Sequence, residues 1–525
     1  MDQKGKIAKA AGVMSAATFI SRVLGFVRDM IFAVYFGATG LSDTFFAAFR
    51  IPNLLRELFA EGAMSAAFIP VLTEYRRKQG EEEARRLVRV TFTFIMIVVG
   101  LVCLAGIFFS PVIVTAIAPG FLSSSEKFSL TVLLTRIMFP FLLFISLSAL
   151  VMGALNTKKV FFIPALAPAM LNVTLILSIV FFESRASQPI LVAAFGILAG
   201  GFVQFAFQLP AFFKKGYSLG FAADFRHPGL KKMSILLIPA TMGLAVNQVN
   251  IVVSNILASY LPSGSITYLY YSMRLTQFPI GIFGVAMGMA VLPALSEHAV
   301  KGDFDRLRDD FSFALRLLFF ITVPAMAGLI ALREPIVNLL FQRGQFDYAA
   351  TRGTSEALLF YSIGIWSIVG VRVVTATFYS MQDTKTPVKI AVVGVLSNVG
   401  FSLALMGPMK HAGLALANAL ASGINFALLF YFLRKKLKRV DARKIIRSFV
   451  KIAAASTIMG LSGWLMLHGD LWTKSGRGLE KAALFAGTSF LCAVIYAAVS
   501  FLFRNEELGY LFETLKKRFA RGVAQ

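Results

Sequence analysis

Long apolar stretches recur from one end of the chain to the other, and shorter polar segments separate them. A helix of about twenty apolar residues crosses a hydrocarbon core roughly 30 Å thick, and each stretch reaches that length. The pattern predicts an all-α membrane protein with fourteen transmembrane helices. The expected spans lie near 11–36, 42–74, 88–117, 128–155, 160–182, 189–213, 232–260, 266–296, 310–332, 353–380, 387–407, 411–433, 447–468 and 481–503.

Composition agrees with this pattern. Of the 525 residues, 57% are hydrophobic and 15% are charged, whereas soluble domains carry about 25% charged residues. The two cysteines, Cys103 and Cys492, lie inside apolar stretches and are expected to be small buried hydrophobes rather than a disulfide. The first stretch is too long for the apolar core of a signal peptide, so we expect a retained first span.

The charge of the chain alternates between the two sides of the expected membrane. The formal net charge is +25, and basic residues concentrate in every second inter-span segment, beginning with the N-terminal tail. The positive-inside rule therefore predicts that both termini are cytoplasmic. This surplus of positive charge favours contact with anionic lipid headgroups. Nucleic acid is not an expected partner, because no basic stripe with interleaved aromatic residues occurs.

Segments in the two halves of the chain also resemble each other. The segment Ala290–Glu297 resembles Ala67–Glu74, and Pro387 follows Pro164 at the same spacing. Each half would hold six spans, an even number, so the halves would be parallel repeats with a site between them near the bilayer midplane. We therefore expect an N-terminal lobe at 1–215, a C-terminal lobe at 216–440, and two further helices with a cytoplasmic tail at 441–525.

Arginines interrupt the first two spans and the eighth. One arginine at the centre of a lipid-exposed span costs roughly 2.5–3.5 kcal/mol, so several of them imply a water-filled cavity or mutual pairing. Arginine forks bind phosphate bidentately, which favours an anionic, phosphorylated substrate. The alternative is that acidic neighbours pair with these arginines and tie helices together. The candidate residues are Arg22, Arg28, Asp29, Asp43, Arg50, Asn53, Arg56, Glu57, Glu61 and Arg274.

The charged and polar residues of the second span do not all lie on one face of the expected helix. On an ideal helix, one face carries Arg50, Asn53, Glu57 and Glu61, while Arg56 lies off it. Pro52 is expected to kink this helix and to reorient the turn that carries Arg56. In the first span, the same geometry places Asp29 near Arg22 rather than near Arg28.

Few other residues or motifs in the sequence indicate a chemical function. Asp383, at the end of the tenth span, either binds a coupling cation or caps the next helix, and capping is the preferred interpretation. No phosphate-binding loop of the Gly-x-x-x-x-Gly-Lys-Ser/Thr type occurs, and the four histidines lack metal-ligand spacing. We therefore expect no metal and no cofactor.

At this point several motifs resemble the MurJ/MviN family of bacterial lipid II flippases, within the multidrug/oligosaccharidyl-lipid/polysaccharide exporter superfamily. The resemblance covers essentially the whole chain. The motifs are SRVLGFVRD at 21–29, PNLLR at 52–56, FAEGA at 59–63, FQRG at 341–344 and YSMQDTKTPVKI at 379–390.

The resemblance implies fourteen helices, two six-helix lobes, a cationic central cavity, and a groove for the undecaprenyl tail formed by the last two helices. It places the cavity arginines at Arg22, Arg28, Arg56 and Arg274, with Asp29 as an ion-pair partner. Asp43 and Arg50 match further charged positions associated with the cavity. Some members carry acidic residues that flank the span-eight arginine, where this chain has Met273 and Gln277, which weakens the expectation of a proton or cation site there. Some members use carboxylates in spans seven and eleven for sodium, whereas span seven here offers Asn247, Gln248 and Asn250, which disfavours sodium coupling.

The expected function is translocation of lipid II, an undecaprenyl-pyrophosphate-linked peptidoglycan precursor, across the bacterial inner membrane by alternating access. A membrane potential or an ion gradient would drive it, with lipid II, membrane lipids and the cell-wall synthesis machinery as partners. A multidrug or other glycan-lipid exporter of the same superfamily is the alternative, and a drug exporter would place carboxylates at its site. An enzyme acting on polyprenyl phosphate would need an acidic metal-binding cluster, which the spans do not supply.

Overall fold

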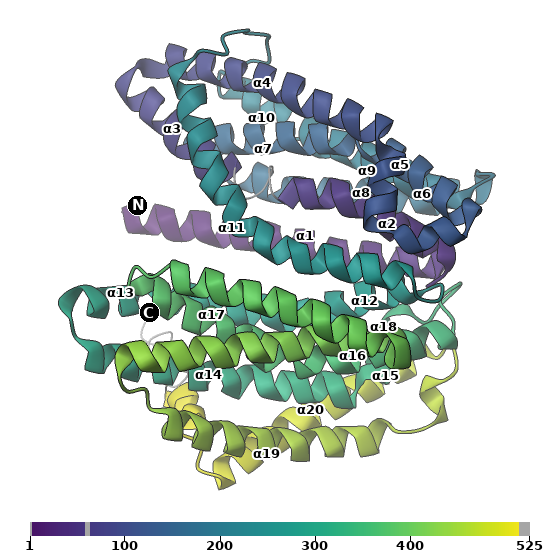
Figure 1. Ribbon diagram of the computed structural model, residues 1–525, viewed down its shortest axis with the longest axis vertical. Helices are drawn as coiled ribbons and strands as arrows, with labels where there is room; N and C mark the ends of the chain where they lie inside the picture. The colour runs from purple at the N-terminus through teal and green to yellow at the C-terminus, as the bar shows by residue number, and fades with distance from the viewer. Residues whose placement is uncertain (1–2, 58–63, 514–525) are drawn as a thin grey trace. The chain divides into compact units, whose positions relative to one another are not determined.

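The computed structural model describes residues 3–57 and 64–513, and within these ranges every regular element is helical (Figure 1). Ten of the described helices are long and apolar enough to cross a membrane. The chain is therefore an all-α protein with the helices of a membrane protein. The number fourteen stays a prediction, although one of the ten, Lys385–Leu437, covers two expected spans because its backbone breaks at Lys410 (φ 51°, ψ −132°).

By packing, the chain divides into two compact units. Unit 1 comprises Met1–Ile266 with Gly344–Phe346, and unit 2 comprises Thr267–Arg343 with Asp347–Gln525. These units group helices by contact rather than by internal repeat, so the lobe boundaries expected from the sequence stay a prediction.

Unit 1 is built from eleven α-helices within the described residues. They are α1 (Gln3–Phe36), α2 (Gly40–Leu55), α3 (Met64–Lys78), α4 (Gly80–Phe108), α5 (Ser110–Ile117), α6 (Ser125–Met138), α7 (Phe141–Thr157), α8 (Phe162–Phe182), α9 (Pro189–Ala206), α10 (Leu209–Lys214) and α11 (Pro228–Ser259).

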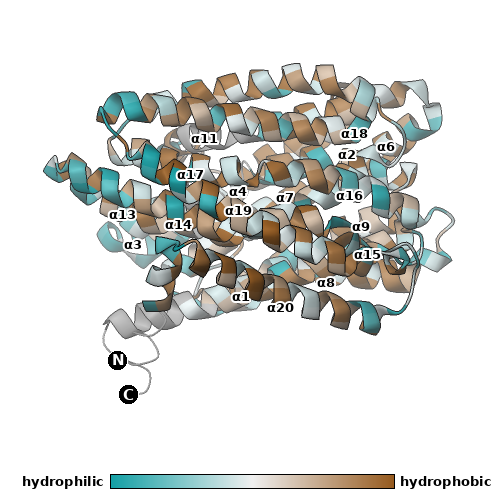
Figure 2. Cartoon of the chain, turned by 90° about the horizontal axis from the view of Figure 1, so that it is seen from below, coloured by the Kyte–Doolittle hydropathy of each residue, from teal (hydrophilic) through white to brown (hydrophobic). Residues whose placement is uncertain are grey.

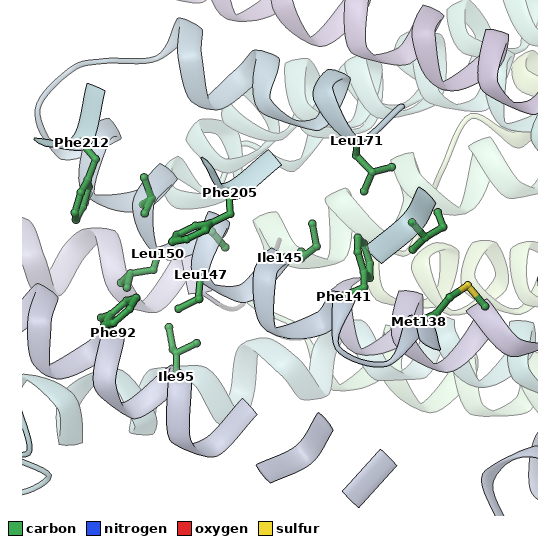
Figure 3. Close-up of a cluster of buried hydrophobic side chains, with 14 of the residues drawn as sticks. Phe92, Ile95, Met138, Phe141, Ile145, Leu147, Leu150, Leu171, Phe205 and Phe212 are labelled. Carbon is green, nitrogen blue, oxygen red and sulfur yellow. The ribbon is translucent and has the colours of Figure 1, made fainter. Parts of the chain in front are cut away.

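The core of unit 1 surrounds α7, which is buried along most of its length. Figure 3 shows Phe141, Ile145 and Leu150 of α7 among side chains from α4, α6, α8, α9 and α10. Small residues let these helices approach closely, as is usual between membrane helices. At Gly201 of α9, an added Cβ atom would lie 2.7 Å from the ring of Phe141.

Unit 2 contains the remaining helices. They are α12 (Ser265–Pro279, whose first two residues belong to unit 1), α13 (Val285–Lys301), α14 (Phe304–Ala331), α15 (Arg333–Phe341), α16 (Tyr348–Ile363), α17 (Ile365–Ser380), α18 (Lys385–Leu437), α19 (Ala442–Leu467), the short η5 (Asp470–Trp472) and α20 (Gly478–Leu502). Helix α14 packs along α17 and α19, and α20 packs on α19.

The outer helices of unit 2 carry large apolar side chains on their surface. Leu465 of α19 and Phe490 of α20 are 69% and 73% exposed. Figure 2 shows hydrophobic residues along the lengths of the helices and hydrophilic ones gathered toward helix ends. This is the distribution that hydrocarbon requires of a spanning helix, whose own backbone groups are satisfied internally.

Several helix starts follow from local sequence. Ser124 accepts a hydrogen bond from the backbone N–H of Lys127 at the start of α6, and Asp347 accepts one from Ala350 at the start of α16. Such caps satisfy backbone donors that the first helical turn leaves without partners. Cys103 and Cys492 are free thiols and buried, as the sequence predicts.

Candidate substrate-binding residues

Arg28 of α1 is held by two neighbours within unit 1. Its Nε and Nη2 donate to Oδ1 of Asp29 at 3.0 and 2.6 Å, and its Nη1 donates to Oδ1 of Asn172 at 3.1 Å. Asn172, on α8, also donates to the backbone carbonyl of Ser21 at 3.3 Å, which fixes its amide. The guanidinium is thus oriented by a nearly buried carboxylate and by a residue on a second helix.

On the helical wheel Asp29 lies nearer to Arg22 than to Arg28, yet the ion pair in the structure joins Asp29 to Arg28. Asp29 contacts Arg28, its immediate neighbour, whereas Arg22 is exposed and forms no ion pair within the described part of the chain. Angles on a helical wheel describe Cα positions, and an arginine side chain is long enough to turn back toward an adjacent carboxylate. Asn172, which sequence reasoning missed, accepts a hydrogen bond from the guanidinium in that position.

A second cluster lies where α2 ends. Arg56 Nε donates to Oδ1 of Asn53 at 3.1 Å, and Asn53 Nδ2 donates to Oε1 of Glu57 at 3.1 Å. Gln248 of α11 donates to the other oxygen of Glu57. Arg56 therefore belongs to the same cluster as Asn53 although the ideal helix separates them, and Pro52 lies in the helical turn just before it.

The other candidates in unit 1 have different surroundings. Asp43 is buried, and its Oδ2 accepts the backbone N–H of Gly264 at 2.6 Å, which joins the first turn of α2 to the segment after α11. Arg50 is half-buried on α2. Glu61 lies outside the described residues.

Arg274 belongs to unit 2, where it is half-buried on α12. Its neighbours Tyr271 and Ser272 are fully buried, and the hydroxyl of Ser272 donates to the backbone carbonyl of Thr354 on α16 at 3.0 Å. A wide π-type turn, Ile280–Gly284, follows the end of α12 at Pro279. Such turns are frequent near functional residues, and this one begins a few residues beyond Arg274.

Asp383 caps the first turn of α18. Oδ1 accepts the backbone N–H of Thr386 at 3.0 Å, and Oδ2 accepts the Thr386 hydroxyl at 2.9 Å and Lys436 Nζ at 2.7 Å. Burial by itself would raise the pKa of Asp383, but the hydrogen bonds from Lys436 and Thr386 outweigh it and lower this pKa to about 2. The carboxylate is therefore ionised and already engaged by a cation.

Part of the FQRG motif has a structural explanation. In unit 2, Gln342 donates to the backbone carbonyl of Thr473 at 2.9 Å and accepts from Asn338 at 2.7 Å. In unit 1, Gly344 has φ +58°, and an added Cβ atom would lie 2.3 Å from the backbone oxygen of Val34. Only glycine fits such a position without strain. Within the described residues, no group of three or more His, Cys, Asp and Glu side chains could hold a metal ion.

The fold defines the class of protein. The chain shares its fold with a structure titled inward-facing conformation of a multidrug resistance MATE family transporter of the MOP superfamily, with a TM-score of 0.67 at 14% identity, over 82% of this chain and 98% of that one. This likeness defines the class by its fold, an all-helical membrane architecture.

Within this class, the chain belongs to the MurJ family. The family model described as lipid II flippase MurJ matches residues 32–475. A lipid II flippase MurJ from Burkholderia cenocepacia is 36% identical over 94% of this chain and 96% of its own length. A probable lipid II flippase MurJ from Vibrio cholerae serotype O1 is 36% identical over 95% of this chain and 96% of its own length. A structure titled lipid II flippase MurJ, inward closed conformation, has a TM-score of 0.77 at 29% identity, over 94% of this chain and 99% of that chain.

Proposed function

We propose that the chain is a lipid II flippase of the bacterial cytoplasmic membrane, which moves the lipid-linked peptidoglycan precursor from the inner to the outer leaflet. The observation that carries this proposal is membership of the MurJ family along nearly the whole chain. No covalent chemistry is required, because the substrate changes leaflet and not structure.

Arg22, Arg28, Arg56 and Arg274 are the residues proposed to bind the pyrophosphate. Two of them support this role by their surroundings, since Arg28 and Arg56 are each oriented by an amide side chain. A guanidinium that is already oriented loses less side-chain freedom when it binds a phosphate. The exposed apolar surface of α19 and α20 is the proposed path of the undecaprenyl tail.

Transport is proposed to proceed by alternating access between two parallel six-helix lobes, with fourteen spans in total and both termini in the cytoplasm. Internal prolines at Pro70 of α3 and Pro293 of α13 agree with the repeat. A membrane potential or an ion gradient supplies the energy, and the cell-wall synthesis machinery consumes the product. A coupling-ion or gating role for Asp383 stays a prediction, with Lys436 as the group that an ion would displace.

The rival functions have less support. The likeness to multidrug exporters is at 14–15% identity and concerns the fold alone. A drug exporter for cations requires carboxylates at its site, whereas the candidate residues here are mostly arginines. The metal cluster that a polyprenyl-phosphate enzyme would need does not occur in the described residues.

The test is leaflet-resolved transport of lipid II by purified protein in vesicles. Arg28→Ala, Arg56→Ala and Arg274→Ala each remove charge-assisted contacts worth roughly 1.5–3 kcal/mol, so transport is expected to fall at least about tenfold. Lysine in place of each arginine is expected to restore transport only in part. Arg185→Ala, at an exposed position of the short 3-10 helix Glu183–Arg185, is the matched control and is expected to behave as the unaltered protein.

Arg28 needs a second variant, because its removal takes away a cation that pairs with the buried carboxylate of Asp29. The double substitution Arg28→Gln with Asp29→Asn removes both charges and is expected to keep normal protein levels in the membrane without transport. Normal transport by this double variant and by the other two alanine variants would refute the proposed binding site.

A further inference from the structure

A basic cavity of about 670 Å³ lies in unit 2, at the start of α19 and just beyond the end of α20. Seven lysine and arginine side chains line it, against three carboxylates. The cavity is not formed by any of the arginines proposed to bind lipid II.

Two of the three carboxylates are already neutralised by cations of the cavity wall. Glu507, nearly fully buried, accepts from Arg316 Nη1 at 2.7 Å and from the Ser448 hydroxyl at 3.0 Å. Glu506 pairs with Arg316 at 2.9 Å and with Lys444 at 3.6 Å. The remaining cations therefore determine the charge that an occupant would meet.

Those remaining cations point to an anionic occupant. Arg443 and Arg447 are four residues apart on α19 and share a helix face, and Arg504 follows α20. Within the described residues, none of the three has a carboxylate within 4.0 Å. Several uncompensated guanidinium groups around one cavity attract phosphate oxygens, which accept bidentate hydrogen bonds from such groups.

Buried polar atoms at the same cavity lack partners. Asn505 is only 6% exposed, and neither its Nδ2 nor its Oδ1 has a hydrogen-bond partner among the described residues. Nε of Arg316, which is equally buried, also has none. Buried polar groups are nearly always hydrogen-bonded, so these two residues of the cavity wall have hydrogen-bonding capacity that their protein neighbours do not use.

The surroundings favour a lipid over a soluble anion. Ile446 and Val450, next to the two arginines on α19, are 61% and 59% exposed, and Phe501 and Leu502 at the end of α20 are about three-quarters exposed. The cavity thus lies where an apolar, membrane-spanning surface meets clustered basic groups. Basic pockets of this kind at helix ends accept the headgroups of anionic lipids.

We propose that this cavity binds the phosphate of an anionic membrane phospholipid, whose acyl chains lie along the exposed faces of α19 and α20. Arg443, Arg447 and Arg504 contact the phosphate oxygens, and Asn505 donates from Nδ2. None of the arginines proposed to bind the pyrophosphate lines this cavity, although the acyl chains would share the apolar surface proposed for the undecaprenyl tail. Phospholipid binding is measured without lipid II, so the proposed function and this lipid site can fail independently of each other.

Native mass spectrometry of the full-length protein tests the proposal, with phosphatidylglycerol or phosphatidylcholine titrated into the micelles. We expect phosphatidylglycerol to bind tightly and phosphatidylcholine not to bind tightly. Arg443→Gln with Arg447→Gln is expected to weaken it roughly thirtyfold, since each cation near an anionic headgroup contributes about a fivefold factor. The matched control is Arg434→Gln with Lys435→Gln, two exposed cations at the end of α18, which is expected to change nothing.

The variant Asn505→Ala distinguishes a loss of lipid binding from a loss of folding stability. Because the amide has no partner within the described residues, its removal is expected to leave the melting temperature unchanged in phosphatidylcholine. It is expected to reduce the stabilisation that phosphatidylglycerol gives to the unaltered protein. Equal loss of binding in both charge-pair variants would overturn the proposal in favour of diffuse surface attraction. Displacement of the lipid by millimolar inorganic phosphate would overturn it in favour of a soluble anion.

Discussion

At the scale of single residues, the immediate partners decide what each charged group can do. Asp29 and Asp383 are both aspartates beside a cation, yet their surroundings differ. Asp29 is nearly buried and orients Arg28, whereas Asp383 lies between α17 and α18 and combines a helix cap with a contact to Lys436. The first pair orients a candidate substrate ligand, and the second stabilises the start of a helix.

The two contributions of Asp383 can be separated by substitution. Asp383→Asn keeps an acceptor for the Thr386 N–H but loses the charge that faces Lys436, and Asp383→Ala loses both. Loss of a cap costs about 0.5–2 kcal/mol, so we expect a lower melting temperature for the alanine variant than for the asparagine variant, and the highest for the unaltered protein.

This order depends on pH. Folding lowers the pKa of Asp383 from 3.8 to about 2, so its charge stabilises the folded state fully above about pH 4, and this stabilisation is lost as pH falls toward 2. Melting curves from pH 7 down to pH 2.5 measure it. Equal melting temperatures for the asparagine variant and the unaltered protein at pH 7 would show that Lys436 contributes nothing.

At the scale of elements, a buried polar cluster joins α15, the segment after η5, and α20. Lys481 of α20 is 2% exposed and donates to Oδ1 of Asn338 at 2.9 Å and to the backbone carbonyl of Lys474. Asn338 donates to the carbonyl of Trp472 at 2.6 Å. The loop between the last two helices is therefore fixed to α15 by hydrogen bonds in addition to the apolar contacts of Trp472.

Asn338→Leu is expected to lower the free energy of unfolding by roughly 1.5–3 kcal/mol, because it removes one acceptor of the buried Lys481 ammonium and leaves the Lys474 carbonyl. Adding Lys481→Met should recover much of this loss, since the buried charge is then gone. Denaturant unfolding in detergent measures both. Additive losses in the double variant would contradict a coupled cluster.

At the scale of the whole molecule, the distribution of Lys and Arg between spans sets the expected orientation. Arg439 precedes α19 and Gly476 follows it, so one apolar helix separates two loops that the charge pattern assigns to opposite sides. This expectation depends on sequence alone and needs no knowledge of how the two units are arranged.

Fusions to a reporter that is active only outside the cytoplasm test the orientation. The reporter is expected to be silent after Lys78, Lys215 and Arg439 and active after Gly476. The pair that flanks α19 is the internal control, because a single helix must reverse the signal. Activity after Lys215 would refute both the orientation and the parallel repeat.

The sequence by itself determined the all-helical membrane architecture, the family and the arginine-bearing helices. Apolar periodicity, charge between spans and short motifs are local properties, and the bilayer imposes few alternatives on them. The same local reasoning predicted that Asp383 caps the helix that follows it, and the structure shows this cap.

Tertiary structure decided which groups meet. It paired Asp29 with Arg28 rather than Arg22, brought Asn172 and Gln248 from other helices to the candidate clusters, and assembled a basic cavity from α14, α19 and the end of α20. Asn172 and Gln248 lie far along the chain from the residues that they contact and carry no motif of their own. Their proximity follows from helix packing, which no single segment encodes.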